Sequence, residues 1–330
     1  MKTSKNQPDP AFLRYRQAAL QLATHLKADP DLKHYASVMA QCGAGRDNLY
    51  GPSTGRQPFY CHKRFCPICQ YRKVWKWRST VRHRLARTHD QHSGMRMIYL
   101  TLTVRDPPLS ELRATVKRMQ RAYTKLRATR HWRLNVIGDM RFLEVVPDTV
   151  HDDYAHPHFH CILLVRASMW GGKDYLSQER WQAIWAQCLG QEDLPHVHAE
   201  RVKGLDATAL MNEAEARTRY SLKPMLPEDV PAQAWICETI KQLKGLRTVT
   251  AGGELRAIAS SLTEDDIRTA APETRELWKQ DLQAILNDPD LAWADEESHE
   301  DGLNSDPASG SSESDNVNVL CHNNVKNTRR

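Results

Sequence analysis

The segment HPHFHCILLV, residues 156–165, places three histidines on alternate positions directly before an apolar run. This pattern predicts a β-strand, because successive side chains of a strand point to opposite faces of the sheet. His156, His158 and His160 would then share one face, where two imidazoles can bind one ion or one anionic group. The alternative is a half-buried strand whose polar face happens to carry histidine, and these ten residues alone do not decide between the two.

A carboxylate on the preceding predicted strand, residues 140–146, favours the ion-binding interpretation. Glu144 lies between apolar residues in RFLEVV, where a carboxylate is costly unless it is paired or metal-bound. If this strand forms a hairpin with residues 158–165, Glu144 lies beside His158 or His160. One carboxylate and two imidazoles leave positions open for water and a phosphate oxygen, which suits Mg²⁺ or Mn²⁺.

A group of cysteines predicts a second, structural metal site. Cys61, Cys66 and Cys69 form the pattern C-x4-C-x2-C, and Cys42 lies upstream. Thiolates at this spacing on a proline-containing turn can bind one tetrahedral Zn²⁺, with His62 as a substitute ligand, whereas unrelated buried cysteines are the alternative. The first residues, MKTSKNQPDPAF, contain no apolar signal segment, and no apolar run is long enough to span a membrane. We therefore expect a cytoplasmic protein without a membrane partner, in which metal ligation is favoured over disulfides.

Charge is distributed unevenly along the chain. Residues 61–96 hold ten lysines and arginines against one acid, whereas residues 288–330 hold ten acids against three bases. The basic stretch indicates a nucleic-acid partner, with a solvated cationic helix face as the alternative. Aromatic residues among these cations can stack on bases, although core packing is the favoured interpretation for the tryptophans. The cations expected to contact DNA are Lys63, Arg64, Arg72, Lys73, Lys76, Arg78 and Arg219.

The segment EARTRYSLKPM contains a candidate nucleophile. Tyr220 lies near the end of a predicted helix, with Arg219 beside it and Lys223 one turn further on. A tyrosine hydroxyl is a poor nucleophile until its proton is removed or its phenolate is stabilised, and a nearby lysine can contribute to both. A tyrosine near a helix end is more often structural, so this segment is informative only together with the others.

The predicted elements define the expected organisation of the chain. Strands are expected at residues 97–105, 140–146, 158–165 and 196–202, and helices at 9–26, 111–132, 177–189, 207–223 and 229–286, the last interrupted by TVTAGGEL. This order predicts an α+β fold with a central, mostly antiparallel sheet covered by helices on one face, and an N-terminal zinc-binding module. The expected segments are an N-terminal helical segment (1–34), a cysteine zinc module with a basic helix (35–92), a catalytic domain (93–225), a helical region (226–286) and an acidic disordered tail (287–330).

Three of these segments, YLTLTVRD, HPHFH and RYSLK, resemble in this order the motifs of HUH endonucleases. More narrowly, they resemble the single-tyrosine replication initiators (Rep) of small rolling-circle bacterial plasmids. FYCHKRFCPICQYRK and LKGLRTVTAGGELRAI resemble the segments that flank the motifs in that family. The resemblance therefore extends over residues 40–260.

The resemblance implies the ferredoxin-like arrangement of the HUH endonucleases and a reaction on plasmid DNA. Tyr220 would attack the scissile phosphate at the double-strand origin and stay joined to the 5′ end, while the free 3′ hydroxyl primes the host DNA polymerase. Glu144, His158 and His160 would hold the divalent ion that polarises the phosphate. The sequence has no GxxxxGK phosphate loop, so unwinding is expected from a host helicase. The oligomeric state is left open, a homo-oligomer included.

One position departs from the pattern of the family. Relatives with a single tyrosine can use a glutamate four residues before it to activate water in termination, and Ala216 occupies that position here. Glu213 and Glu215 are the candidate substitutes, and a second protomer's tyrosine is the other route. An HUH transposase or a mobilisation relaxase would keep the same chemistry. A non-catalytic, zinc-dependent DNA-binding repressor would leave the histidines and Tyr220 with structural roles.

Overall fold

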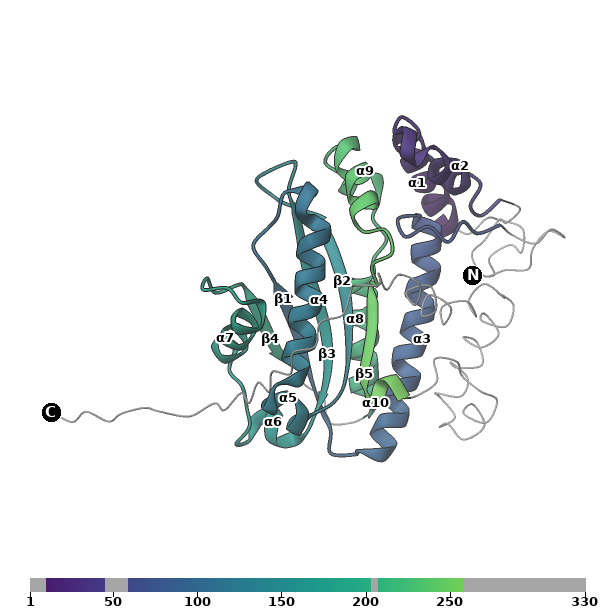
Figure 1. The fold of residues 1–330 in the computed structure, drawn as a ribbon. Helices are drawn as coiled ribbons and strands as arrows, with labels where there is room; N and C mark the ends of the chain where they lie inside the picture. The colour runs from purple at the N-terminus through teal and green to yellow at the C-terminus, as the bar shows by residue number, and fades with distance from the viewer. Residues whose placement is uncertain (1–9, 45–58, 203–206, 258–330) are drawn as a thin grey trace, which may run out of the picture.

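The computed structural model describes residues 10–44, 59–202 and 207–257, which form helices packed around a five-stranded sheet (Figure 1). The helices are α1 (Pro10–Leu26), α2 (Lys33–Ala40), α3 (Pro67–Gln91), α4 (Leu112–Ala128), α5 (Arg130–Asn135), α6 (Ala167–Gly171), α7 (Gln178–Leu189), α8 (Ala207–Ser221), α9 (Gln233–Gln242) and α10 (Glu254–Ala257). The strands are β1 (Arg96–Thr103), β2 (Val136–Pro147), β3 (Ala155–Val165), β4 (Val197–Arg201) and β5 (Val249–Gly253). Short 3-10 helices are η1 (Pro30–Leu32), η2 (Leu109–Glu111) and η3 (Pro227–Asp229).

Two sequence expectations fall partly or wholly beyond these ranges. The predicted acidic tail and the end of the predicted C-terminal helical region lie outside the described residues. Within the described ranges, none of the helices combines the length and the apolar composition that crossing a membrane requires.

The strands pair antiparallel throughout the sheet, in the order β4-β1-β3-β2-β5. The prediction of an α+β fold with a mostly antiparallel sheet is therefore confirmed. β2 and β3 form the predicted hairpin, and its register places Glu144 opposite His158 and Phe142 opposite His160. Because side chains alternate along each strand, Glu144, His158 and His160 project from the same face of the sheet.

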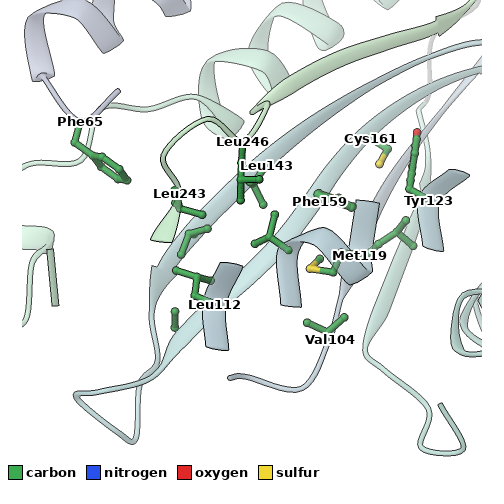
Figure 2. Packing of buried hydrophobic residues seen from close by; sticks show 14 of the residues in the cluster. Phe65, Val104, Leu112, Met119, Tyr123, Leu143, Phe159, Cys161, Leu243 and Leu246 are labelled. Carbon is green, nitrogen blue, oxygen red and sulfur yellow. The ribbon is translucent and has the colours of Figure 1, made fainter. Parts of the chain in front are cut away.

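Helices cover both faces of this sheet, so the prediction of helices on one face is wrong. One face packs against α4, α5 and α7, and Figure 2 shows Phe159 and Cys161 of β3 in one cluster with Met119 and Tyr123 of α4. The other face packs against α3 and α8 through residues such as Ile162. The run CILLV in β3 is buried at every position, as expected for a central strand covered on both sides.

The helix predicted at residues 111–132 is divided into α4 and α5. Thr129 ends α4 with extended backbone, and its side-chain oxygen accepts a hydrogen bond from the backbone N–H of Trp132, which caps the start of α5. The buried positions of α4 recur every three or four residues from Leu112 to Leu126 and face the sheet. The opposite side of α4 is therefore left to the solvent.

β5 lies inside TVTAGGEL, where the sequence predicts only an interruption between helices. It pairs with β2, so residues beyond 225 contribute to the same sheet as the predicted catalytic domain. The glycines that end the strand conceal it in the sequence, yet the structure requires them. A Cβ atom at Gly252 would collide with Arg127 and Asp139, and Gly253 has a positive φ of 58°.

The N-terminal helices α1 and α2 pack against each other, and α1 also contacts α3. α3 starts at Pro67, a favourable first helical residue because the missing N–H has no intrahelical partner at that position. From there α3 runs for 25 residues and packs against α8 (Figure 1). α3 thus connects the N-terminal helices with the helix that contains the predicted nucleophile.

Candidate metal centres and nucleophile

Glu144, His158 and His160 converge near the end of the β2–β3 hairpin. The Oε2 atom of Glu144 lies 2.9 Å from Nε2 of His158 and 2.7 Å from Nε2 of His160, and the two Nε2 atoms are 3.0 Å apart. Both histidines are buried and the glutamate is half-buried. The strand register accounts for this convergence, since it pairs Glu144 directly with His158. The structure therefore brings together the three side chains predicted to bind a divalent ion, referred to below as the histidine–glutamate cluster.

The other nitrogen of each imidazole has a partner of its own, which fixes the orientation of both rings. Nδ1–H of His158 donates to the backbone carbonyl of His156 at 3.3 Å, and Nδ1 of His160 lies 3.4 Å from the hydroxyl of Thr101. The ring of Tyr99 stacks on His160, with the centroids 5.6 Å apart. Metal-binding histidines commonly use their second nitrogen in this way, because it fixes the ring and keeps a proton on Nδ1 when Nε2 gives up its own proton to bind the metal.

The electrostatics of the cluster suit a cation. Burial by itself would raise the pKa of Glu144, but hydrogen bonds from His158 and His160 outweigh it and bring the pKa to about 2. Burial lowers the pKa of His160, which favours the neutral imidazole that binds metals. Neighbouring ligands of an octahedral ion at about 2.1 Å lie about 3 Å apart, which matches the separations of the three ligand atoms. The residues therefore fit one Mg²⁺ or Mn²⁺ ion.

A hydrogen-bonded pair that the sequence analysis did not identify lies beside the cluster. The Oδ1 atom of Asp106 lies 2.6 Å from Nδ1 of His156, and the ring of His156 is 5.0 Å from that of His158. Asp106 ends the segment YLTLTVRD and His156 begins HPHFH, so the pair joins two of the sequence motifs. The aspartate at the end of the first motif is the signal that could have identified it.

The candidate nucleophile belongs to the last turn of α8. The side chains of Tyr220 and Arg219 lie outside the described part of the structure, but the neighbouring Ser221 is held by Tyr99, whose hydroxyl is 3.3 Å from Ser221 Oγ. Tyr99 also stacks on His160, so the end of α8 lies beside the histidine–glutamate cluster. Burial raises the pKa of Tyr99 above its usual value, which keeps Tyr99 itself a neutral phenol.

A cavity of about 260 Å³ opens beside Glu144. Its walls come from the end of β2, from the residues after α8 and from the loop before α3, and they include Lys223 and Arg64. Lys223, predicted to assist the nucleophile, thus faces the same space as a predicted metal ligand. Arg64 donates hydrogen bonds to the backbone carbonyls of Leu243 and Leu246, and its contact with DNA stays a prediction.

The two glutamates considered for water activation are both held in ion pairs. Glu215 lies 3.0 Å from the guanidinium of Arg78 and 2.8 Å from that of Arg82, and these contacts join α8 to α3. Glu213 binds Arg217, one turn away on α8, at 2.8 Å. Glu215 thus anchors α8 to α3, whereas the ion pair of Glu213 lies within α8, and a role for either carboxylate in termination stays a prediction.

The four predicted cysteine ligands lie together beside the N-terminal helices. Sγ of Cys69 lies 3.5 Å from that of Cys42 and 3.7 Å from that of Cys61, and all four sulfur atoms, that of Cys66 included, lie within 4.8 Å of one another. A disulfide would need about 2.05 Å. The edge of a ZnS₄ tetrahedron with bonds of about 2.3 Å is about 3.8 Å, close to the two shortest separations. The thiols therefore fit one structural Zn²⁺ ion.

The cysteine cluster is closed, and its internal hydrogen bonds favour one thiolate, at Cys69, while they raise the pKa values of the Cys61 and Cys66 thiols. Hydrogen bonds with Cys42, Cys61 and Cys66 lower the pKa of Cys69 well below its usual value. His62, considered above as a substitute ligand, has a positive φ of 52°, is exposed and does not belong to this group of four. Four sulfur ligands complete a tetrahedron, so the cluster leaves no position for a substrate.

Several cations predicted to contact DNA are used inside the protein. Arg72 is 4% exposed, and its guanidinium lies over the ring of Tyr60, 3.3 Å from the centroid. Arg78 is paired with α8, and Lys63 lies over another aromatic ring. Lys73 is half-buried, and the side chain of Lys76 lies outside the described residues. A substantial part of the charge of α3 therefore stabilises the fold.

These features define a class of protein: an α+β chain with an open histidine–glutamate cluster beside a helix end and a closed cluster of four cysteines. Residues 54–298 match the family described as Replication protein. The chain belongs to this family of replication proteins, which confirms the resemblance to plasmid replication initiators indicated by the motifs.

Individual relatives agree with this assignment. The chain is 28% identical to Protein rep of Lactiplantibacillus plantarum over 221 residues, which cover 64% of this chain and 69% of that protein. It is 27% identical to Protein rep of Streptococcus pneumoniae over 208 residues, covering 62% and 64% of the two chains. Protein rep of Lentilactobacillus hilgardii is 25% identical over 281 residues, covering 80% and 86%. No solved structure gives a significant match.

Proposed function

We propose that this protein nicks one strand of a plasmid origin with Tyr220 as the nucleophile and initiates rolling-circle replication from the free 3′ end. The observation that carries the proposal is the cluster of Glu144, His158 and His160 beside the end of α8. The element order β1-α4-β2-β3-α7-β4, with the strand order β4-β1-β3-β2, corresponds to a ferredoxin-like arrangement and supports an HUH endonuclease. Membership of the replication-protein family favours replication over transposition or mobilisation.

In the proposed reaction, the scissile phosphate occupies the cavity beside Glu144. The histidine–glutamate cluster would hold Mg²⁺ or Mn²⁺, which supplies Lewis-acid polarisation of a phosphate oxygen when bound. The hydroxyl of Tyr220 releases its proton to water and attacks phosphorus, and the 3′ oxygen leaves and takes up a proton from water, so one phosphodiester bond is exchanged for one phosphotyrosine bond. Lys223, in the same cavity, stabilises the charge that develops on the phosphate. The phosphotyrosine retains the bond energy, so strands can be rejoined without ATP.

Contacts on two sides of α8 position the nucleophile in this proposal. Tyr99 holds Ser221 beside the histidines, and Glu215 holds the middle of α8 against α3. Such rigidity matters because attack requires reacting atoms that are held about 3–3.5 Å apart.

We assign a structural Zn²⁺ to the cysteine cluster, where it would fix the first turn of α3. Origin DNA, a host DNA polymerase and a host helicase are the partners that this function requires. The reaction would take place in the cytoplasm, where the polymerase and the helicase act.

A covalent-adduct assay tests the proposed function. The full chain is incubated with Mn²⁺ and labelled single-stranded oligonucleotides from the cognate origin, and adducts are detected on a denaturing gel. The expected result is an adduct that EDTA prevents and that mass spectrometry maps to Tyr220. Tyr220→Phe should abolish the adduct, whereas the matched control Tyr175→Phe, at an exposed tyrosine before α7, should not change its yield.

Two results would contradict this mechanism. Cleavage by Tyr220→Phe at the wild-type rate would remove Tyr220 from the reaction. Absence of an adduct with every oligonucleotide, despite tight binding of duplex origin DNA, would favour the non-catalytic DNA-binding repressor.

A further inference from the structure

α4 presents positive charge on the side of the molecule opposite the histidine–glutamate cluster. It lies over the sheet (Figure 1) and packs on the face that contains Phe159. His158 and His160 project from the other face. Residues 112–135, which form α4 and α5, include eight lysines and arginines and no acid. The DNA contacts expected from the sequence involve α3, the loop before it and Arg219, so the proposed function leaves this surface without a role.

Every exposed position of α4 is either cationic or small. These positions are Ala114, Lys117, Arg121, Thr124, Lys125 and Ala128. Lys117, Arg121 and Lys125, called the α4 stripe below, follow one another at intervals of four residues and therefore lie along one side of the helix over about 12 Å. The exposed Arg130 and Arg133 of α5 continue the positive charge beyond the end of α4. Small residues between the cations leave room for a ligand to approach the helix.

The α4 stripe has no ionic partner among the residues that the structure describes. α4 forms an ion pair through Arg127, with the buried Asp139, and none through Lys117, Arg121 or Lys125. Like charges four residues apart on a helix repel each other and destabilise it, whereas interspersed acids would relieve the repulsion. A stripe that costs stability and has no described intramolecular partner indicates an anionic partner that binds there.

We propose that the α4 stripe binds the sugar–phosphate backbone of a DNA duplex, on the opposite side of the sheet from the strand that is cleaved. Surfaces for single strands combine cations with aromatic side chains on which bases stack. The exposed positions of α4 contain no aromatic residue, so the stripe contacts phosphates alone. Phosphate contacts do not distinguish one base from another, so the stripe would bind a duplex of any sequence. A span of about 12 Å covers about three to four phosphates of one strand, at about 3.4 Å for each nucleotide.

The salt dependence of duplex binding tests the proposal. The triple variant Lys117→Gln, Arg121→Gln, Lys125→Gln is compared with the wild type for binding to a labelled duplex of unrelated sequence at several NaCl concentrations. Each lost phosphate contact reduces the slope of log K against log salt by about 0.9, so the expected reduction is about 2 to 3. The variant should melt no lower than the wild type, because the substitutions remove repulsion from an exposed helix surface.

A second triple variant separates the α4 stripe from net charge. Lys27→Gln, Lys33→Gln, Lys173→Gln removes the same charge from exposed positions elsewhere and should leave the slope unchanged. Equal slopes for the wild type and the α4 triple variant would overturn the proposal. Loss of affinity for a single strand but not for the duplex would also overturn it and assign the stripe to single-stranded DNA. The slopes of the wild type and the α4 triple variant could also differ only after residues 288–330 are removed. That result would show that the acidic tail, and not the duplex, occupies the stripe in the full chain, and it would overturn the proposal.

The test does not depend on the nicking reaction. Each protein is also assayed for covalent adduct formation with a short single-stranded origin oligonucleotide, whose yield should be equal in all three proteins. If the wild type forms no adduct, the proposed nicking activity fails, but the salt slopes still decide whether α4 binds duplex DNA.

Discussion

The two candidate metal centres are built in opposite ways. The histidine–glutamate cluster comes from one hairpin, is set by strand register, and offers three ligand atoms beside a cavity. The cysteine cluster comes from the end of α2, the loop before α3 and the start of α3, and its four ligands complete a tetrahedron. Open sites are typical of catalytic metals and closed sites of structural metals. The comparison predicts that an ion at the histidine–glutamate cluster serves the reaction and that an ion at the cysteine cluster serves the fold.

The largest effect on this comparison should come from replacing Cys66 and Cys69 by serine. Structural zinc contributes an apparent binding free energy of about 10–16 kcal/mol in small zinc-binding peptides, and a typical domain has a total stability of only about 5–15 kcal/mol. The variant should lose one equivalent of zinc and melt far below the wild type, as measured by metal analysis and calorimetry. Cys188→Ser, at a buried cysteine of α7, is the control that should keep its zinc. A double variant that melts like the wild type would show that the cluster is not a structural metal site.

His160→Ala should remove catalysis and leave the fold intact, which is the opposite result. Loss of one stabilising group at a reacting phosphate typically costs about 10²–10³ in rate, or about 2.7–4 kcal/mol. Adduct formation should fall by that factor and the zinc content should stay at the wild-type value, while the melting temperature should fall far less than in the cysteine variant, because Glu144 keeps its contact with His158. His34→Ala, at an exposed histidine of α2, should change neither. If His160→Ala unfolds the protein as the cysteine variant does, the distinction between the two centres is lost.

The pH dependence of the free energy of unfolding, measured in protein freed of Mg²⁺ and Mn²⁺, should separate the two centres further. The pKa of Glu144 is lowered from 4.5 to about 2 in the fold, so the unfolded chain binds the proton more tightly. This contribution to the free energy of unfolding is therefore complete above the pKa of Glu144 in the unfolded chain. It amounts to about 3 kcal/mol and is lost as the pH falls from 4.5 towards 2. Denaturant unfolding measured through this range should show a flatter pH dependence for Glu144→Gln, which isolates the carboxylate from the cysteines. Equal pH dependence in both proteins would contradict the histidine contacts of Glu144.

The smallest effect should come from Thr101→Val, which removes only the hydroxyl beside Nδ1 of His160. Loss of such a partner typically costs 10- to 100-fold in metal affinity, or about 1.4–2.7 kcal/mol. The Mn²⁺ concentration that gives half-maximal cleavage should rise by that factor, whereas the zinc content stays the same. Thr124→Val, at an exposed position of α4, serves as the control. An unchanged Mn²⁺ requirement would mean that the hydroxyl does not orient His160.

The convergence of both ligand sets could be predicted because each depends on local sequence patterns. Alternation in HPHFH and the isolated carboxylate in RFLEVV are sufficient to place Glu144 beside the histidines, once the two strands pair as a hairpin. Close spacing of three cysteines indicates one cluster, although Cys42 joins it only through the tertiary contact of α1 and α2 with the rest of the chain. The alternation also predicts the face from which the ligands project.

Features that depend on long-range contacts could not be predicted in the same way. β5 is Gly-rich because Gly252 passes close to Arg127 and Asp139, a reason that appears only once β5 lies beside β2. In the sequence, the charge of Arg72 indicates a DNA contact, and only the fold reveals that this side chain is buried. The ion pairs of Glu215 likewise depend on a helix more than a hundred residues away. The run CILLV did contain the signal for helices on both faces, since a strand exposed on one side would alternate.

α3 connects the cysteine cluster rigidly to α8, the helix that contains Tyr220. Its first turn contains Cys69, and Arg78 and Arg82 further along hold α8 through Glu215. No proline or glycine interrupts α3 after Pro67, so a shift of its first turn is transmitted along the axis instead of being absorbed by a kink. The distance from Cys69 to Arg82 along this rod is about 20 Å, because each residue advances the helix by about 1.5 Å. The cysteine cluster thus fixes the axial position of α3, and through α3 the position of the helix that contains the predicted nucleophile.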